Sequence, residues 1–135
     1  RRSEEESVTI HIRGIHTKIR GVTQILYEMF FNICENAIKY NHPGGEVVFT
    51  ISKMGEYPTV IVEDTGIGIP KEDIDSIFER FYRVDKSHSK KVGGTGLGLS
   101  IVKHVCACHN ATIRVKSKVG KGTTIYVTFP NNVNN

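Results

Sequence analysis

Residues 22–40 read VTQILYEMFFNICENAIKY, and this stretch decides the fold. Its apolar residues recur at spacings of three and four, which predicts an amphipathic helix of about five turns from Val22 to Tyr40. The polar face opposite this stripe carries Glu28, Asn32, Glu35, Asn36 and Lys39. The carboxamides of Asn32 and Asn36, one turn apart, suit a cation site, and the alternative is an ordinary solvated face.

Strands are predicted on both sides of this helix. Apolar and polar residues alternate over 8–12 and again in the stretch that ends at Ile19. This pattern predicts a short pair of strands about Gly14. The β-branched runs 46–53 and 59–64 form an antiparallel hairpin, which delivers Asp64 to a loop. Two further strands, 112–116 and 123–129, close the domain.

Two more helices are predicted. Pro70 suits the first turn of a short helix with Ile74, Ile77, Phe78 and Phe81 on one face. Residues 83–98 are polar, basic and glycine-rich without a period, which predicts a mobile loop. A helix resumes at Leu97, with Ile101, Val105 and Cys108 at helical spacing, and Asn110 suits the left-handed residue that ends it.

These elements predict an α/β fold, a two-layer α/β sandwich whose mixed, mostly antiparallel sheet is covered on one face by helices. The 135 residues are 39% hydrophobic and 24% charged, which is typical of one compact domain, here residues 1–130 with a frayed tail at 131–135. No window approaches the ~20 apolar residues of a membrane-spanning helix. Because the sequence opens without Met, we interpret it as a piece of a longer polypeptide.

Charge and cysteine content limit the classes of ligand that the chain can bind and the redox compartment in which it works. The 18 basic and 14 acidic residues leave a mild net charge of +4 spread over the chain, which favours a lining for a phosphate ligand over a nucleic-acid surface. Three cysteines, an odd number, favour a reducing compartment over a disulfide framework. Possible zinc ligands cluster at His104, Cys106, Cys108 and His109. On one helix they point around the cylinder, so packing is favoured over zinc.

Two glycine-containing segments suit a nucleotide. In residues 62–70, VEDTGIGIP, Asp64 ends a strand and is followed by Gly66 and Gly68, so the backbone can pass close to a flat ligand that donates to Asp64. Residues 93–99, GGTGLGL, run into a helix whose N-terminal amides suit phosphate, although a flexible linker would look similar. Neither the dinucleotide fingerprint nor the P-loop pattern is present.

Taken in order, these segments resemble the ATP-binding catalytic domain of bacterial sensor histidine kinases, in the superfamily that includes the gyrase, Hsp90 and MutL ATPases. Residues 31–40 resemble the N box, 64–68 the G1 box, 77–83 the F box and 94–98 the G2 box. The likeness extends over residues 10–130, and residues 81–90 resemble the phosphate-regulon type of sensor kinase. It implies a Bergerat ATP-binding fold with ATP and Mg²⁺ as ligands.

The resemblance also implies roles for individual residues. Asp64 would accept the adenine amino group and disfavour guanine, whose carbonyl a carboxylate repels. Asn36 would bind Mg²⁺ with Asn32 beside it, and Arg83 would neutralise the γ-phosphate. The residues implied in catalysis are Asn32, Lys39 and Arg83. The implied ATP contacts besides Asn32, Asn36, Asp64 and Arg83 are Lys39, Tyr40, Gly66, Gly68, Ile69, Phe78, Tyr82, Gly94, Thr95, Gly96, Leu97, Gly98, Leu99 and Thr123.

The residue type at position 32 distinguishes phosphate transfer from ATP hydrolysis. The hydrolysing relatives have a glutamate there to activate water, and an amide lacks a basic lone pair, so slow hydrolysis is expected. None of the six histidines has the setting of a phosphoacceptor, which implies a separate dimerisation and phosphoacceptor domain as partner. A response-regulator receiver domain would then take the phosphate. The resemblance implies a monomeric cytoplasmic domain of a membrane-anchored parent. The alternative is a degenerate nucleotide-binding regulatory module without phosphotransfer.

Overall fold

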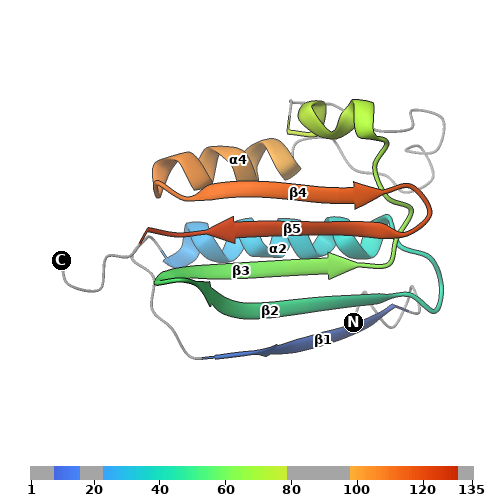
Figure 1. Cartoon of the computed structure of the whole chain (residues 1–135), viewed down its shortest axis with the longest axis horizontal. Helices are drawn as coiled ribbons and strands as arrows, with labels where there is room; N and C mark the ends of the chain where they lie inside the picture. The colour runs from blue at the N-terminus through green and yellow to red at the C-terminus, as the bar shows by residue number, and fades with distance from the viewer. Residues whose placement is uncertain (1–7, 16–22, 79–97, 131–135) are drawn as a thin grey trace.

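The computed structural model describes residues 8–15, 23–78 and 98–130 (Figure 1). Along the chain the elements are β1 (Thr9–Gly14), α2 (Thr23–Lys39), β2 (Glu46–Met54), β3 (Tyr57–Asp64), the 3₁₀-helix η1 (Lys71–Ser76), α4 (Gly98–Cys108), β4 (Thr112–Lys118) and β5 (Gly122–Thr128). The five strands form one sheet in the order β1-β2-β3-β5-β4. β1 pairs with β2 in parallel, and the other pairs are antiparallel. No helix in the described ranges is long and apolar enough to cross a membrane.

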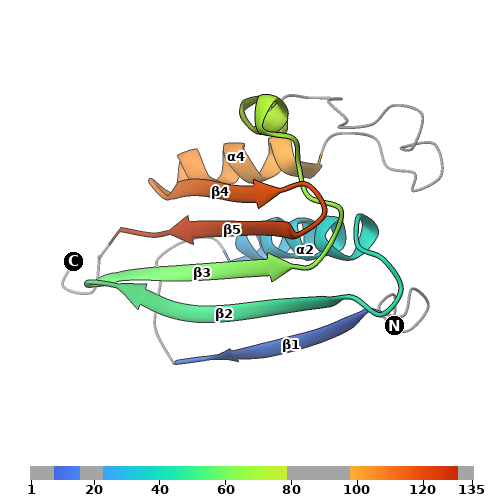
Figure 2. The same ribbon diagram turned by 45° about the vertical axis from the view of Figure 1, so that its right-hand side comes forward.

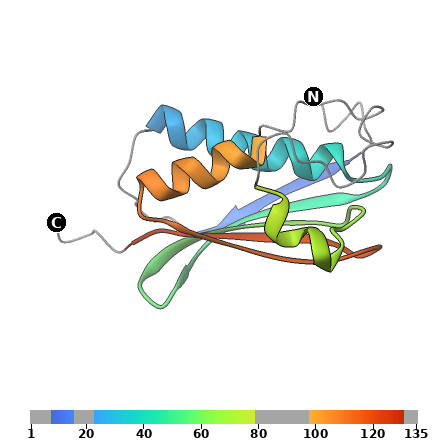
Figure 3. The same cartoon turned by 90° about the horizontal axis from the view of Figure 1, so that it is seen from above.

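Both long helices cover the same face of the sheet (Figure 3). Side chains of a strand alternate between faces, so Val47 on β2, Val62 on β3 and Val127 on β5 meet the helices, and all three are buried. α2 contributes Met29 and Ile33 to the same core. The predicted two-layer sandwich is therefore confirmed, and the sheet face opposite the helices carries no element in the described residues (Figure 2).

α2 matches the predicted helix within one residue at each end. Its last turn closes with the Tyr40 N–H donating to the Asn36 carbonyl at 3.1 Å. Asn41 then forms the turn, because its Oδ1 accepts from the His42 N–H at 2.8 Å and its Nδ2 donates to the Glu46 carbonyl at 3.1 Å. The helix end is thus held against the start of β2.

Three local predictions differ from the structure or fall partly outside the described residues. The first predicted strand is confirmed as β1, whereas the rest of the predicted pair, residues 16–19, lies outside the described residues. The helix predicted after Pro70 is a short 3₁₀-helix, in which the Asp73 N–H donates to the Pro70 carbonyl three residues back at 2.9 Å. Of the predicted loop at 83–98, residues 83–97 also lie outside the described residues, and Gly98 begins α4.

α4 buries Val105, as its predicted stripe implies, but the other residues that it buries were not in that stripe. Val102, Val105 and Cys106 are buried, while Ile101 is 42% exposed and Cys108 is exposed. The reason is that α4 packs on α2 as well as on the sheet, with Cys106 Sγ 3.6 Å from Met29 Sδ. The predicted left-handed residue at the end of this helix is confirmed, since Asn110 has φ 57°.

The three thiols should differ sharply in reactivity. Burial raises the pKa of Cys34 and of Cys106 to about 11, so only about 0.1% of each is thiolate at pH 8. We expect one thiol, that of the exposed Cys108, to react with iodoacetamide at least about tenfold faster than the others. Mass spectrometry of timed digests measures this, and Cys108→Ser should remove the fast phase. Fast labelling of Cys34 or Cys106 in the folded chain would contradict it.

Candidate functional site

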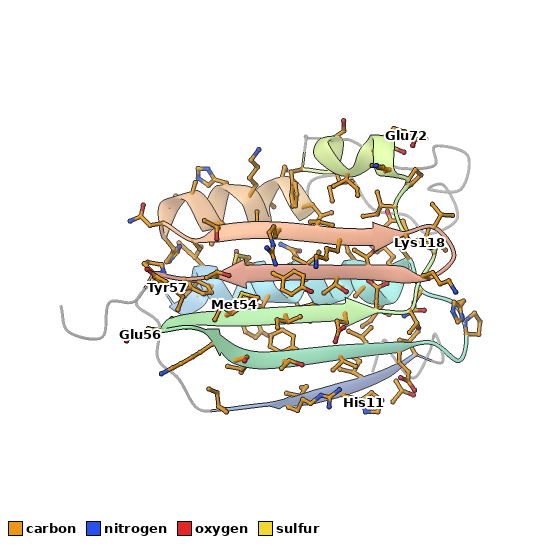
Figure 4. The ribbon with its side chains drawn as sticks, viewed as in Figure 1. His11, Met54, Glu56, Tyr57, Glu72 and Lys118 are labelled. Atoms are coloured by element: carbon orange, nitrogen blue, oxygen red, sulfur yellow. The ribbon has the colours of Figure 1, made fainter. Side chains whose placement is uncertain are left out.

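Two of the predicted ATP residues, Asp64 and Thr123, lie at one end of the sheet, where β3 and β4 end and β5 begins. Asp64 pairs with Thr123, and Thr123 pairs with Ser117, so the three form one row across the strands on the helix-covered face. In Figure 4, Lys118 marks this end, whereas Met54, Glu56 and Tyr57 lie at the opposite end around the β2–β3 turn.

Asp64 is held in one orientation by the main chain. Its Oδ1 accepts from the Gly66 N–H at 2.8 Å and from the Thr123 N–H at 3.2 Å. Burial raises the pKa of this carboxyl above its usual 3.8, and the two backbone bonds oppose that shift. With Oδ1 saturated, Oδ2 is the oxygen left to accept a hydrogen bond from a ligand.

The loop from Thr65 to Pro70 is clamped between α2 and the β4–β5 turn. The Ile67 N–H donates to the Tyr40 carbonyl at 3.0 Å, and the Ile67 carbonyl accepts from the Gly120 N–H at 2.9 Å. On the other side of Gly68, the Ile69 N–H donates to Ser117 Oγ at 2.7 Å. The predicted contacts of this loop therefore stand on a backbone fixed from two sides.

Both glycines of the loop are required by close approach. A Cβ at Gly66 would meet the Tyr40 carbonyl, and a Cβ at Gly68 would meet the Lys118 carbonyl. Gly68 also has φ +79°, a conformation that other residues rarely adopt. The sequence analysis expected these glycines to let the backbone pass close to a flat ligand. The close neighbours in the structure are other parts of this chain, and the contact with a ligand stays a prediction.

Two hydroxyl residues escaped the sequence analysis. Ser117 Oγ accepts from Ile69 and bonds the Gly122 carbonyl at 2.9 Å and Thr123 Oγ1 at 2.7 Å. Thr65 Oγ1 accepts from the Glu46 N–H at 2.9 Å. Serine and threonine are common in strands and turns, so only the tertiary contacts identify these two as supports of the site.

The polar face of α2 lies one turn from the glycine loop, since Tyr40 bonds both Asn36 and Ile67. Asn32, Asn36, Lys39 and Tyr40 are all half-buried. Asn36 Nδ2 donates to the Asn32 carbonyl at 2.9 Å, which commits the amide nitrogen to the helix and leaves Oδ1 as the acceptor. Amide oxygen is the kind of donor that Mg²⁺ takes from proteins, so this arrangement fits the predicted metal ligand.

The remaining predicted ATP residues divide into two groups. Gly98 begins α4, while Phe78 and Leu99 are half-buried, with Leu99 packed on the core. Tyr82, Arg83, Gly94, Thr95, Gly96 and Leu97 lie outside the described residues, so their contacts stay predictions.

A hollow of about 490 Å³ opens at the same end of the sheet. Its walls include Glu63, Lys116 and Thr124, which share a row on the helix-free face. Asp64 and Thr123 border it, but the carboxamides of α2 do not. The hollow therefore contacts the predicted adenine end only and does not unite the predicted site.

Residues 21–133 match the family of histidine kinase-, DNA gyrase B- and HSP90-like ATPases. The sensor histidine kinase WalK of Bacillus subtilis is 48% identical over 111 residues, covering 81% of this chain and 18% of the relative. The sensor-like histidine kinase SenX3 of Mycolicibacterium smegmatis is 44% identical over 113 residues, covering 84% and 29%. The chain thus spans less than a third of these relatives.

Two solved structures share the fold. The mycobacterial sensor histidine kinase MprB superposes with a TM-score of 0.83 at 26% identity, over 96% of this chain and 88% of that one. Full-length ShkA, solved in complex with AMPPNP, superposes with a TM-score of 0.82 at 26% identity, over 96% of this chain and 27% of that one.

Proposed function

Because this chain belongs to the family of histidine kinase-, DNA gyrase B- and HSP90-like ATPases, we propose that it binds Mg-ATP and presents the γ-phosphate to a histidine on a separate dimerisation domain. The relatives described above are sensor histidine kinases, so the receiver aspartate of a response regulator would be the next acceptor. The parent would be membrane-anchored, with this domain in the cytoplasm and monomeric on its own. The observation that carries the proposal is the fixed orientation of Asp64 beside the glycine loop.

Asp64 supports adenine as the base. Two main-chain donors hold Oδ1, so Oδ2 is the acceptor available to the exocyclic amino group of adenine. Guanine places a carbonyl at the same position, and two acceptors facing each other repel. Thr123 lies beside Asp64 in the row and would border the same base.

The polar face of α2 supports a magnesium-bound triphosphate. Asn36 would hold the ion through Oδ1, with Asn32 one turn before it and Lys39 one turn nearer the glycine loop. When bound, Mg²⁺ neutralises charge on the phosphate oxygens. Asn32 lacks the basicity to activate water, which favours transfer over hydrolysis. Arg83 and the glycines of residues 94–98 would complete the phosphate contacts.

Nucleotide binding is tested first on the chain alone. We expect calorimetry to detect AMPPNP binding that Mg²⁺ strengthens and that GTP does not match. Asn36→Ala should remove the magnesium-dependent gain, about tenfold in affinity, because the oxygen ligand is lost. Gln24→Ala removes an exposed carboxamide from the same helix and should change nothing. A magnesium response that survives in Asn36→Ala would contradict the assignment.

Phosphotransfer needs a second experiment. ATP labelled on its γ-phosphate is added to this chain together with the helical dimerisation domain of a matching kinase. The acid-labile label that appears on that domain is measured. We expect label on its histidine and little release of free phosphate. Nucleotide binding without any transferred label would instead favour a regulatory module that senses ATP.

A further inference from the structure

A histidine and a cysteine pair up on the surface of α4, away from the nucleotide residues. His104 and Cys108 lie one turn apart, both are exposed, and Cys108 Sγ is 3.7 Å from His104 Nε2. Figure 1 shows that α4 begins near the middle of the molecule and runs away from the β4–β5 turn, and Cys108 is its last residue. Over its 11 residues the helix advances about 15 Å, so this pair is separate from Gly98 and the phosphate end.

The spacing of the two atoms matches a shared metal ion. Zinc binds thiolate sulfur at about 2.3 Å and imidazole nitrogen at about 2.0–2.1 Å, so a tetrahedral angle separates the two ligands by about 3.6 Å. The observed 3.7 Å is close to that span, so the two side chains need little rearrangement to share an ion.

The local field also favours a cation. Cys108 is the last residue of α4, and a helix C-terminus carries partial negative charge. No basic residue occupies the last turn of this helix to cancel that charge.

The other two possible zinc ligands noted in the sequence, Cys106 and His109, make different contacts. Cys106 is buried against Met29, and His109 Nδ1 bonds the Val105 carbonyl at 2.8 Å. Within the described ranges no group of three or more potential ligand residues exists, so the chain supplies two ligands to any ion here.

We propose that His104 Nε2 and Cys108 Sγ form a binding site for Zn²⁺. Water, or the same pair from a second copy of the chain, completes the tetrahedron. On binding, the thiol loses its proton to solvent as the sulfur–zinc bond forms, the neutral imidazole donates its lone pair, and no electrons are transferred.

Zinc titration of the reduced 135-residue chain, without nucleotide, tests the site. Calorimetry in two buffers of different ionisation enthalpy should show one binding event with proton release. His104→Ala and Cys108→Ser should each weaken the affinity by about tenfold or more, because one of two ligands is gone. His109→Gln and Cys34→Ser, the matched imidazole and thiol controls, should stay within about twofold of the parent. A stoichiometry of one zinc per chain indicates water ligands, one per two chains indicates a second copy, and either supports the pair.

A second readout is protection of the thiol. Zinc should slow alkylation of Cys108 in the parent chain and in His109→Gln, but not in His104→Ala. The proposal is overturned if the His104 and Cys108 variants bind zinc like the parent, if no zinc binds, or if alkylation of Cys108 is unaffected. Because no nucleotide is present, either result leaves the proposed kinase function to its own test.

Discussion

Asp64→Asn is expected to weaken adenine nucleotide binding by about 100-fold or more, while the fold stays intact. The two backbone donors that hold Oδ1 would hold the oxygen of the new carboxamide in the same place. Its NH₂ group must then occupy the position of Oδ2 and face the amino group of adenine, donor against donor. Calorimetric titration with AMPPNP measures the loss.

The free energy of unfolding shows whether Asp64→Asn loses nucleotide binding without losing its fold. Burial raises the pKa of the Asp64 carboxyl, so the folded chain binds this proton more tightly than the unfolded chain. Between the usual value of 3.8 and the raised value, the free energy of unfolding therefore falls as pH rises. The asparagine variant lacks this contribution, so at neutral pH it should unfold in urea no earlier than the parent. Tight AMPPNP binding by the variant, or its loss of stability at pH 7, would contradict the assignment.

Gly68→Ala is expected to destabilise the chain by about 3 kcal/mol or more. The left-handed backbone costs a residue with a Cβ about 1–2 kcal/mol, and the new methyl would in addition overlap the Lys118 carbonyl. That carbonyl lies beside Ser117 and Gly120, which hydrogen-bond the loop at Ile69 and Ile67. Neither the loop nor the β4–β5 turn can therefore move away without breaking these bonds. Urea denaturation monitored by circular dichroism gives the free energy difference.

Gly120→Ala is the matched control. Gly120 has φ +83°, nearly the same as Gly68, but a Cβ there would meet nothing within 4 Å. Its substitution should destabilise the chain by about 1–2 kcal/mol, which is the conformational cost alone. Equal losses in the two variants would show that close approach at Gly68 contributes nothing.

The sequence alone predicted the elements whose signals are local. The three-and-four spacing on residues 22–40 located α2 within one residue at each end, and the β-branched runs around the Met54–Tyr57 turn located the β2–β3 hairpin. Asn110 was predicted as left-handed from its residue type alone. The motif order identified the family, because a nucleotide site needs particular residue types at particular positions.

Other features depended on contacts between distant segments. Cys106 is buried and Cys108 exposed because α4 packs against α2, which no pattern within α4 encodes. The parallel pairing of β1 with β2 likewise follows from the sheet and not from either strand.

The sequence by itself determined which residues could serve the site: the carboxylate at 64, the carboxamides at 32 and 36, and the glycines that follow Asp64. Only the tertiary structure decided how they are held. Residues 117 and 123 are brought beside Asp64 by strand register, and the Gly66–Gly68 loop packs closely against carbonyls 26 and 50 residues away in the chain, those of Tyr40 and Lys118. Hydrogen bonds and close contacts of this kind depend on distance in space, which residue types in sequence do not specify.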